Sequence, residues 1–343
     1  MKTLNTIRRM LFFCAATLAF AVPLCAETPA GNLLKKPDDW FQSKDGLATL
    51  LNILAWQTKH GDWPKNTDTS GKPDFKADQK PVGTFDNSAT TGELRVLARA
   101  FRVTSDDRYA KAFLAGFDHV LKAQYANGGW PQFYPLSKEY HRHITFNDGT
   151  MIRLMEFLRD TTSDEDFAVL DAHRREAAKA AVDRGIDCIV KCQVVVDGRR
   201  TVWCAQHDAE SLVPVQARSY ELPSLSGAES AGILRFLVTL DQPSDEVVRA
   251  VTDGARWFKA TKIDGYRYRK NNVEPALVND ADAPPLWARF YEIESNRPIF
   301  SDRDGVVKYA LEDIGSERRG GYTWYGNWGE NVLKEYARWP HRQ

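Results

Sequence analysis

Two short stretches of the sequence each place an aspartate beside an asparagine. Asp86 precedes Asn87 in the first stretch, Asn147 precedes Asp148 in the second, and a phenylalanine stands before each pair. Such side chains are favoured at helix N-caps, where they accept hydrogen bonds from free backbone N–H groups. Carboxylate and amide oxygens are also the ligands that calcium takes in proteins. The residue types therefore allow two explanations, helix capping and a shared calcium site.

Three arginines stand beside aromatic residues in segments that resemble loops or helix boundaries. They are Arg218, Arg289 and Arg303. A guanidinium group can bind a carboxylate through two parallel hydrogen bonds and keeps its charge at ordinary pH. Each arginine could therefore bind an acidic ligand. The alternative is a structural ion pair, because Glu221 and Asp302 stand close by in the sequence.

Tryptophan and tyrosine residues are concentrated in the segments expected to be loops. Exposed rings can stack on sugars, but loops that pack against each other also bury aromatic residues. His143 and His207 have the chemistry of acids and bases, although structural histidines are commoner. The aromatic set comprises Trp63, Trp130, Trp203, Trp324, Trp328, Tyr134, Tyr322 and Tyr325.

A repeated motif precedes the acidic pairs and predicts how they are positioned. Gly-x-Trp-Pro occurs around Trp63 and again around Trp130, each roughly 20 residues before one acidic pair, and a degenerate third copy begins at Thr201. Apolar residues at helical spacing follow each copy, so the repeat consists of a loop and a pair of helices. One pair cannot bury its apolar face alone. Three copies therefore predict a mostly helical fold, an (α/α)3 toroid of three helical hairpins.

The predicted toroid occupies about residues 45–262. Its clearest helices lie within 105–126 and 164–193, and the strand signals are short, with a hairpin expected between 194–196 and 200–203. The remaining segment, 263–343, is rich in aromatic residues, proline and glycine. It predicts irregular, aromatic-rich loops over one end of the ring.

Composition and charge narrow the classes of function. The 343 residues are 43% hydrophobic, enough for a large core, and 46 Lys and Arg balance 46 Asp and Glu. A net charge of zero disfavours nucleic acid as a partner, so a polyanion would need a local basic site. Phosphate-binding loops, G-x-S-x-G elbows and H-E-x-x-H helices are absent from the sequence.

The N-terminal residues have the pattern of an export signal. Lys2, Arg8 and Arg9 precede an apolar run from Met10 to Leu24. Cys25 suggests a lipoprotein alternative, but the residues before it are larger than such a site prefers. We expect residues 1–26 to be a cleaved signal peptide. We expect 27–343 to form a single catalytic domain that is secreted or periplasmic and has no membrane attachment after cleavage.

Three cysteines lie outside the expected signal. Cys188 and Cys192 are four residues apart on one helix face, a spacing that strains a disulfide. One of them could pair with Cys204, or all could stay buried. A zinc-like cluster of these cysteines with His207 is a further alternative.

Several longer stretches resemble the polysaccharide lyase family 10 pectate lyases. They are NGGWPQFYP, HITFNDGTM, VWCAQHD, ARSYELPSLSGAES, PLWARFYEIESNRPIFSDRDG and GYTWYGNW. The similarity extends from about Asp45 to Trp328. The resemblance implies a helical toroid that cleaves polygalacturonate by calcium-assisted β-elimination, giving unsaturated oligogalacturonides.

The resemblance also implies roles for individual residues. Asp86 and Asp148 would hold Ca²⁺, Arg218 and Arg289 would bind uronate carboxylates, and Arg303 would be the catalytic base. We assign Asn87, Asn147, His143 and Trp130 to substrate binding, and we expect the protein to be a monomer.

The implied chemistry fits these residue types. A base removes the C5 proton of a galacturonate and the C4 oxygen leaves, so negative charge develops on a group that is already anionic. Calcium and two arginines would stabilise that charge. Arginine holds its proton tightly. A metal ion and neighbouring guanidinium groups would lower the pKa of Arg303.

Two other functions are compatible with the sequence. A glycoside hydrolase on a similar toroid would use Asp86 and Asp148 as its two carboxyl groups and would need no metal. A non-catalytic protein would bind pectin through the loop tryptophans. Only a lyase forms a conjugated double bond from polygalacturonate, and only a metal-dependent one stops when a chelator is added.

Overall fold

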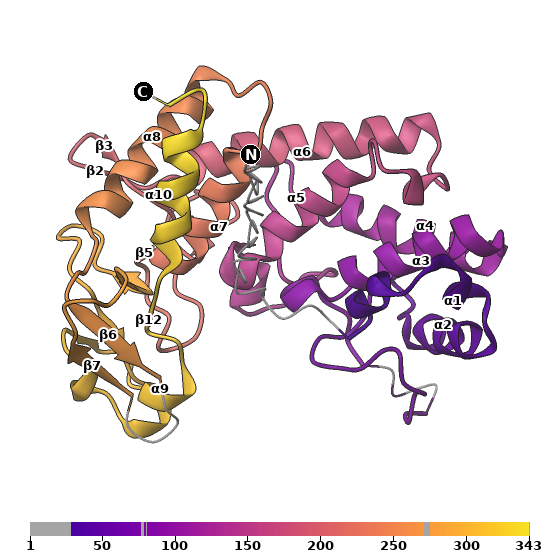
Figure 1. The fold of residues 1–343 in the computed structure, drawn as a ribbon, viewed down its shortest axis with the longest axis horizontal. Coiled ribbons are helices and arrows are strands. Elements are labelled where there is room, and N and C mark those ends of the chain that lie inside the picture. The colour runs from indigo at the N-terminus through magenta and orange to yellow at the C-terminus, as the bar shows by residue number, and fades with distance from the viewer. Residues whose placement is uncertain (1–28, 77–78, 80, 271–274, 343) are drawn as a thin grey trace, which may run out of the picture.

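The computed structural model describes residues 29–76, 79, 81–270 and 275–342, so the predicted signal peptide lies outside the described residues. The described residues form ten α-helices, drawn in Figure 1. Their bounds are α1 Asp38–Gln42, α2 Lys44–Trp56, α3 Thr91–Thr104, α4 Asp107–Ala123, α5 Thr150–Asp160, α6 Ala172–Cys192, α7 Gly227–Leu237, α8 Asp245–Ala260, α9 Ser316–Gly321 and α10 Trp328–Arg338. Short 3₁₀ turns are η1 Gly31–Lys35, η3 Asp86–Ser88, η4 Tyr140–Arg142, η5 Asn147–Gly149, η6 Glu165–Phe167 and η7 Leu311–Asp313.

The helices are arranged in consecutive pairs. α3 packs on α4, α5 on α6, and α7 on α8, while α3, α5 and α7 also contact one another in sequence order. Figure 1 shows these pairs following one another from the indigo N-terminal helices to the orange ones. The prediction of a mostly helical, α/α-toroid fold built from three hairpins is confirmed.

The predicted loop-rich tail contains a helix that the sequence analysis missed. α10 packs against both α7 and α8, beside them in Figure 1. Val332 is buried on this helix, and Trp328, Leu333 and Tyr336 pack against the core. These positions are separated by helical spacing, which the surrounding Gly and Pro residues obscured. The expectation of irregular loops is therefore wrong for residues 328–338.

α4 illustrates how the sequence specifies these helices. Asp106 caps its start, where the side chain accepts a hydrogen bond from the backbone N–H of Arg108 at 3.0 Å. Phe113, Phe117 and Val120 recur at intervals of three and four residues and are fully buried. The helix lies within 105–126, as predicted.

A glutamine follows three of the helices and ties each to its neighbours. Gln57 comes after α2, Gln124 after α4 and Gln193 after α6. Each side-chain amide donates one hydrogen bond to a carbonyl in the following loop. It donates a second to a carbonyl in α4, α6 or α8, respectively. The acceptors are Gly61 and Ala112, Gly128 and Ala181, and Thr201 and Ala250.

The tryptophans of the repeated motif anchor the loops in the core. The indole N–H of Trp63 donates to the carbonyl of Ile53 at 2.8 Å. The other anchors are Trp130 to Val120 at 2.9 Å, Trp203 to Ile189 at 2.7 Å and Trp287 to Phe258 at 2.9 Å. The Trp287 loop is a fourth copy that the Gly-x-Trp-Pro pattern did not reveal, because alanine follows the tryptophan instead of proline.

Short antiparallel strands join loops that are distant in sequence. β1 Ile144–Thr145 pairs with β4 Gln206–His207, β5 Leu225–Ser226 with β9 Phe290–Tyr291, and β8 Trp287–Ala288 with β12 Tyr325–Gly326. The remaining pairs are β2 Val195–Val196 with β3 Arg199–Arg200, β6 Tyr266–Arg269 with β7 Ala276–Asn279, and β10 Phe300–Ser301 with β11 Val307–Lys308. The pair β2 and β3 is the predicted hairpin, turned by Asp197 and Gly198 at φ 49° and 74°.

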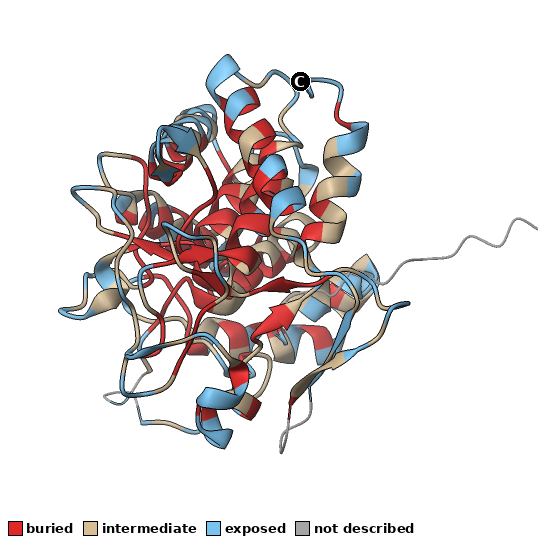
Figure 2. Cartoon of the chain, turned by 90° about the vertical axis from the view of Figure 1, so that its left-hand side faces the viewer, coloured by how far each residue is buried: buried red, intermediate tan, exposed pale blue. Residues whose placement is uncertain are grey.

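The core lies where the helix pairs meet, and Figure 2 shows its buried residues concentrated inside the molecule.

Cys188, Cys192 and Cys204 are buried free thiols, with the first two sulfur atoms 4.0 Å apart. His207 Nε2 accepts a hydrogen bond from the Cys204 N–H at 3.1 Å, and His207 Nδ1 donates one to the Leu212 carbonyl at 2.8 Å. Neither the disulfide nor the zinc-like alternative is formed, since the described residues hold no group of three potential metal ligands.

None of the helices in the described part of the chain is both long and apolar enough to span a membrane.

Glu93 in α3 gives the fold a pH dependence that can be measured. Burial raises the pKa of this carboxyl from about 4.5 to about 7, although Thr69 donates a hydrogen bond to it at 2.8 Å. Between these two pH values the folded chain holds a proton that the unfolded chain has released, so stability falls as pH rises. We expect wild type to lose about 3 kcal/mol more than Glu93→Gln between pH 4.5 and 8.

Urea unfolding at several pH values measures this difference, and the exposed Glu294→Gln is the matched control. Parallel pH profiles for wild type and Glu93→Gln would contradict the assignment.

Candidate active site

The two acidic pairs lie on two 3₁₀ turns, η3 and η5, that contact each other. Asn87 and Asp148 both have left-handed backbone conformations, at φ 52° and 51°. They are therefore equivalent positions in the repeat, and Asp86 is equivalent to Asn147. None of η3, η5, α3 and α5 has a side-chain cap, so the capping explanation is wrong for these four residues.

The following tryptophan loop holds each turn in place. The N–H of Phe85, just before η3, donates to the carbonyl of Gln132 at 3.1 Å. In the next copy the N–H of Asn147 donates to the carbonyl of Ala205 at 2.9 Å, and the third copy joins Gly227 to Arg289 at 2.9 Å. Each accepting carbonyl belongs to the residue two positions after a tryptophan. The fold thus places the acidic turns and these loop residues together.

Asp86 is buried and has two unequal oxygens. Its Oδ2 accepts hydrogen bonds from Lys65 Nζ at 2.5 Å and from Gln132 Nε2 at 2.7 Å. Its Oδ1 is buried without a hydrogen-bond partner. A buried carboxylate oxygen in this condition calls for an explanation, because it has lost its contact with water. A cation bound at Oδ1 supplies one.

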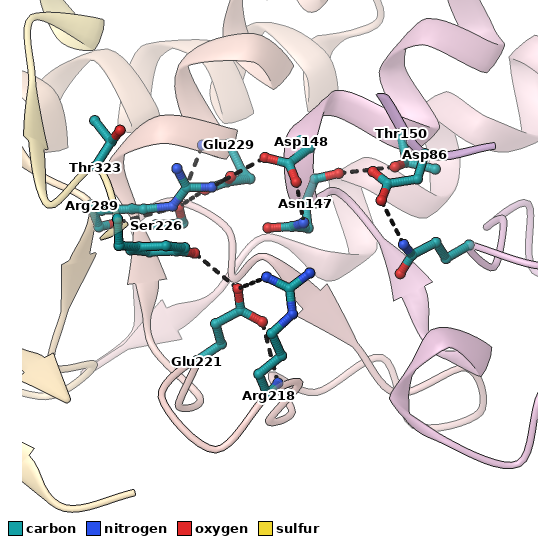
Figure 3. A network of polar contacts seen from close by, with 12 residues as sticks. Asp86, Asn147, Asp148, Thr150, Arg218, Glu221, Ser226, Glu229, Arg289 and Thr323 are labelled. Atoms are coloured by element: carbon teal, nitrogen blue, oxygen red, sulfur yellow. Dashed lines mark hydrogen bonds and ion pairs between the residues drawn. The ribbon is translucent and has the colours of Figure 1, made fainter. Parts of the chain in front are cut away.

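Asp148 is more accessible, with 38% of its side chain exposed. Its Oδ2 accepts a hydrogen bond from Asn147 Nδ2 at 2.8 Å, and its Oδ1 lies 3.5 Å from a guanidinium nitrogen of Arg289. The same nitrogen of Arg289 lies 2.6 Å from Glu229 Oε1. Figure 3 shows Asp148 between this arginine and Asp86. Polar contacts therefore join Asp148 to Arg289 and, through it, to Glu229, while Asp86 lies on the adjoining turn.

Arg289 and Arg218 remain firmly charged. Burial alone would lower the pKa of Arg289, but the carboxylates around it, led by Glu229, outweigh burial and raise that pKa. Burial likewise opposes the charge of Arg218, and Glu221 at 3.4 Å raises its pKa above the ordinary value. In Figure 3 the guanidinium end of Arg218 points toward the turn that carries Asn147. Both arginines are suited to hold anionic groups.

Arg303 occupies a different setting. Its side chain is 65% exposed and pairs with Glu317, with two N–O distances of 3.1 Å. The hydrogen bond to Glu317 raises the pKa of Arg303, the opposite of the predicted lowering. The guanidinium carbon lies 6.0 Å from the ring of Tyr220, which in turn accepts a hydrogen bond from Arg218 at 3.3 Å. Arg303 thus borders the site through Tyr220.

The predicted substrate-binding residues fall into two groups. Asn87 and Asn147 lie on the two acidic turns. His143 Nδ1 lies 3.9 Å from Asp208 Oδ2, and burial lowers the pKa of this histidine. Trp130 is fully buried and anchors its loop. The assignment of Trp130 to substrate binding is wrong, because its ring has no surface left for a sugar.

Five site residues were not predicted from the sequence. Lys65 and Gln132 bind Asp86, Glu229 binds Arg289, and Tyr140 accepts a hydrogen bond from Arg218 at 3.3 Å. Burial lowers the pKa of His141, and the nearby charges of Lys65 and Arg218 act in the same direction. A signal existed for the first two, because Lys65 and Gln132 each directly follow a Trp-Pro pair.

The burial of Trp130 generates a prediction. Trp130→Phe removes the indole hydrogen bond and part of a close-packed ring, so we expect it to lower the free energy of unfolding by about 1–3 kcal/mol. The KM of the folded enzyme should stay within about twofold of wild type. Denaturant unfolding and steady-state kinetics measure the two effects, with the half-buried Trp40→Phe as control. A raised KM at unchanged stability would restore the substrate-binding assignment.

Known proteins similar to this chain point to one family. A profile of the family described as pectic acid lyase matches residues 57–333. A family 10 polysaccharide lyase from Cellvibrio cellulosa is similar in structure, with a TM-score of 0.80 and 35% sequence identity over 92% of this chain and 97% of that one. A mutant of the family 10 enzyme from the same organism, solved in complex with trigalacturonic acid, gives a TM-score of 0.79 and 35% identity over 91% and 97%. No curated protein matches the chain.

The fold and the site thus define a polysaccharide lyase built on an α/α toroid. The chain belongs to the pectic acid lyase family, and its structure matches those of family 10 polysaccharide lyases.

Proposed function

We propose that this protein is a pectate lyase that cleaves α-1,4-polygalacturonate by calcium-assisted β-elimination and releases 4,5-unsaturated oligogalacturonides. One observation carries the proposal. The turns that carry Asp86 and Asp148 contact each other, Asp148 pairs with Arg289, and the guanidinium group of Arg218 points toward the turn of Asn147 and Asp148. The trigalacturonic acid complex of the similar family 10 enzyme supports the choice of substrate.

The side chains present fit a calcium ion. Asp86 offers a buried Oδ1 without a partner, and Asp148 and Asn147 offer further oxygen atoms on the adjoining turn. Calcium takes carboxylate and amide oxygens and completes its shell with water or substrate oxygens. When bound, it would withdraw charge from a uronate carboxylate and so acidify the neighbouring C5 proton.

Residues of the chain are proposed to bind the uronate carboxylates and to remove the C5 proton. Arg289 keeps its charge, and Arg289 and Arg218 are proposed to hold uronate carboxylates near the cleaved bond. We propose Arg303 as the base that takes the C5 proton, on the strength of the sequence resemblance. Arg218 is the structural alternative, because it points toward the acidic turns whereas Arg303 borders the site through Tyr220. The C4–O bond then breaks, the C4–C5 double bond forms, and the departing oxygen takes up a proton from the solvent.

The remaining expectations belong to the same proposal. Asn87, Asn147 and His143 are proposed to contact the sugar, and the enzyme is proposed to act as a monomer after export. The pattern of residues 1–26 supports export to the periplasm or beyond.

The contacts of the two aspartates argue against a glycoside hydrolase. Asp86 is bound by Lys65, and Asp148 lies beside Arg289. A hydrolase needs one carboxyl group free to donate a proton, whereas cation-bound carboxylates are better suited to a metal or to positioning. The buried loop tryptophans, including Trp63, Trp203 and Trp324, remove the basis for a pectin-binding module that uses these rings.

The reaction itself can be tested with polygalacturonate. We expect ultraviolet absorbance from a conjugated double bond, loss of that signal with a chelator, and its return with excess calcium. Asp148→Asn should lower kcat/KM by at least about 100-fold, because it removes charge from the proposed metal site. Asp164→Asn, on an exposed loop, is the control. New reducing ends without absorbance would identify a hydrolase, and activity that survives the chelator would exclude the calcium requirement.

The two candidate bases can be separated by conservative variants. If Arg303 is the base, Arg303→Lys should lower kcat by about 100-fold or more and leave oligogalacturonide affinity largely intact. Arg218→Lys should then act mainly through weaker binding, since lysine cannot grip a carboxylate with two donors. Single-turnover rates and equilibrium binding measure the two effects, with the distant Arg108→Lys as control. A near-normal rate for Arg303→Lys would reject Arg303 as the base.

A further inference from the structure

Both proposed metal-binding aspartates already have a cationic side chain beside them. Lys65 Nζ lies 2.5 Å from Asp86 Oδ2, and a nitrogen of Arg289 lies 3.5 Å from Asp148 Oδ1. The described residues also lack any cluster of three acids, histidines or cysteines that could hold a metal ion. The protein's own charged contribution to a metal site is therefore two carboxylates whose charge is partly compensated.

The fold fixes Lys65 in this position. It stands two residues after Trp63, whose indole is anchored on Ile53 and whose backbone N–H donates to the Thr90 hydroxyl at 3.0 Å. Gln132 occupies the same place in the next copy of the repeat and donates to the same oxygen of Asp86. Two neighbouring copies of the motif thus both direct a donor to Oδ2.

These contacts give the two oxygens of the Asp86 carboxylate different surroundings. Oδ2 receives two donors, and Oδ1 is left buried without any. Outer partners of this kind orient a ligand's free oxygen toward a metal. Lysine differs from a neutral partner because it places a positive charge beside the same carboxylate that would hold the ion. Its side chain is only 27% exposed, so water screens that charge incompletely.

We propose that Lys65 is a positioning residue that makes calcium binding depend on the substrate. This inference rests on the proposed function. Lys65 holds Asp86 so that Oδ1 is left without a protein donor and would be available to the ion, and its charge keeps calcium affinity low while no sugar is bound. A uronate carboxylate supplies the negative charge that compensates Lys65 and Arg289. Calcium and the acidic sugar therefore bind cooperatively, each raising the affinity for the other by the same factor.

Isothermal titration with calcium chloride at pH 8 tests the role of Lys65 without any turnover. We expect Lys65→Met to bind calcium about tenfold more tightly than wild type when no sugar is present. Lys65→Arg, which keeps the charge, should restore weak binding. Lys59→Met removes an exposed lysine from the same loop and should bind like wild type. Thermal melting of each variant checks that it is folded.

A second titration adds galacturonic acid, which has no glycosidic bond to cleave. The sugar should increase the calcium affinity of wild type by a larger factor than that of Lys65→Met. Calcium affinity that is unchanged or weaker in folded Lys65→Met would overturn the inference, as would an equal effect of galacturonic acid on both proteins. Lyase assays with polygalacturonate separate the two proposals, because tighter calcium binding by an inactive enzyme would reject only the proposed reaction.

Discussion

One repeated backbone hydrogen bond holds the active site together. In three successive copies, a backbone N–H at or shortly before the start of α3, α5 or α7 donates to the carbonyl two residues after a tryptophan. The tryptophan indole is fixed in turn on the preceding helix. Because buried backbone groups must be paired, helix, turn and loop form one unit. The side chain two residues after the tryptophan is thereby brought to the site in two of these copies, as Gln132 and Arg289 show.

Charge compensation is the second constraint on the site. Glu229 and Glu221 are buried acids, and each is paired with an arginine that remains protonated. Buried charges without partners would cost several kcal/mol each. An anionic sugar therefore enters a region in which the arginines are already oriented by carboxylates, and little reorganisation is needed before they bind it.

Sequence periodicity and motif spacing revealed much of this architecture. The helices, the hairpin at Asp197 and the two acidic turns followed from apolar spacing, turn residues and a recurring Trp-Pro pair. Burial of Trp130 could not be predicted, because an aromatic residue in a loop has the same sequence signal whether it faces a sugar or the core. The partnership of Lys65 with Asp86 depends on packing between two repeats, and α10 was hidden among Gly and Pro residues.

The left-handed backbone at Asn87 and Asp148 limits how this enzyme can evolve. Among residues with side chains, Asn and Asp tolerate that conformation best, whereas longer or branched side chains are strained in it. A glutamate at position 148 would keep the charge but pay a backbone cost that the present residue largely avoids. The main chain therefore favours only a few residue types at these two positions, before any ligand is considered.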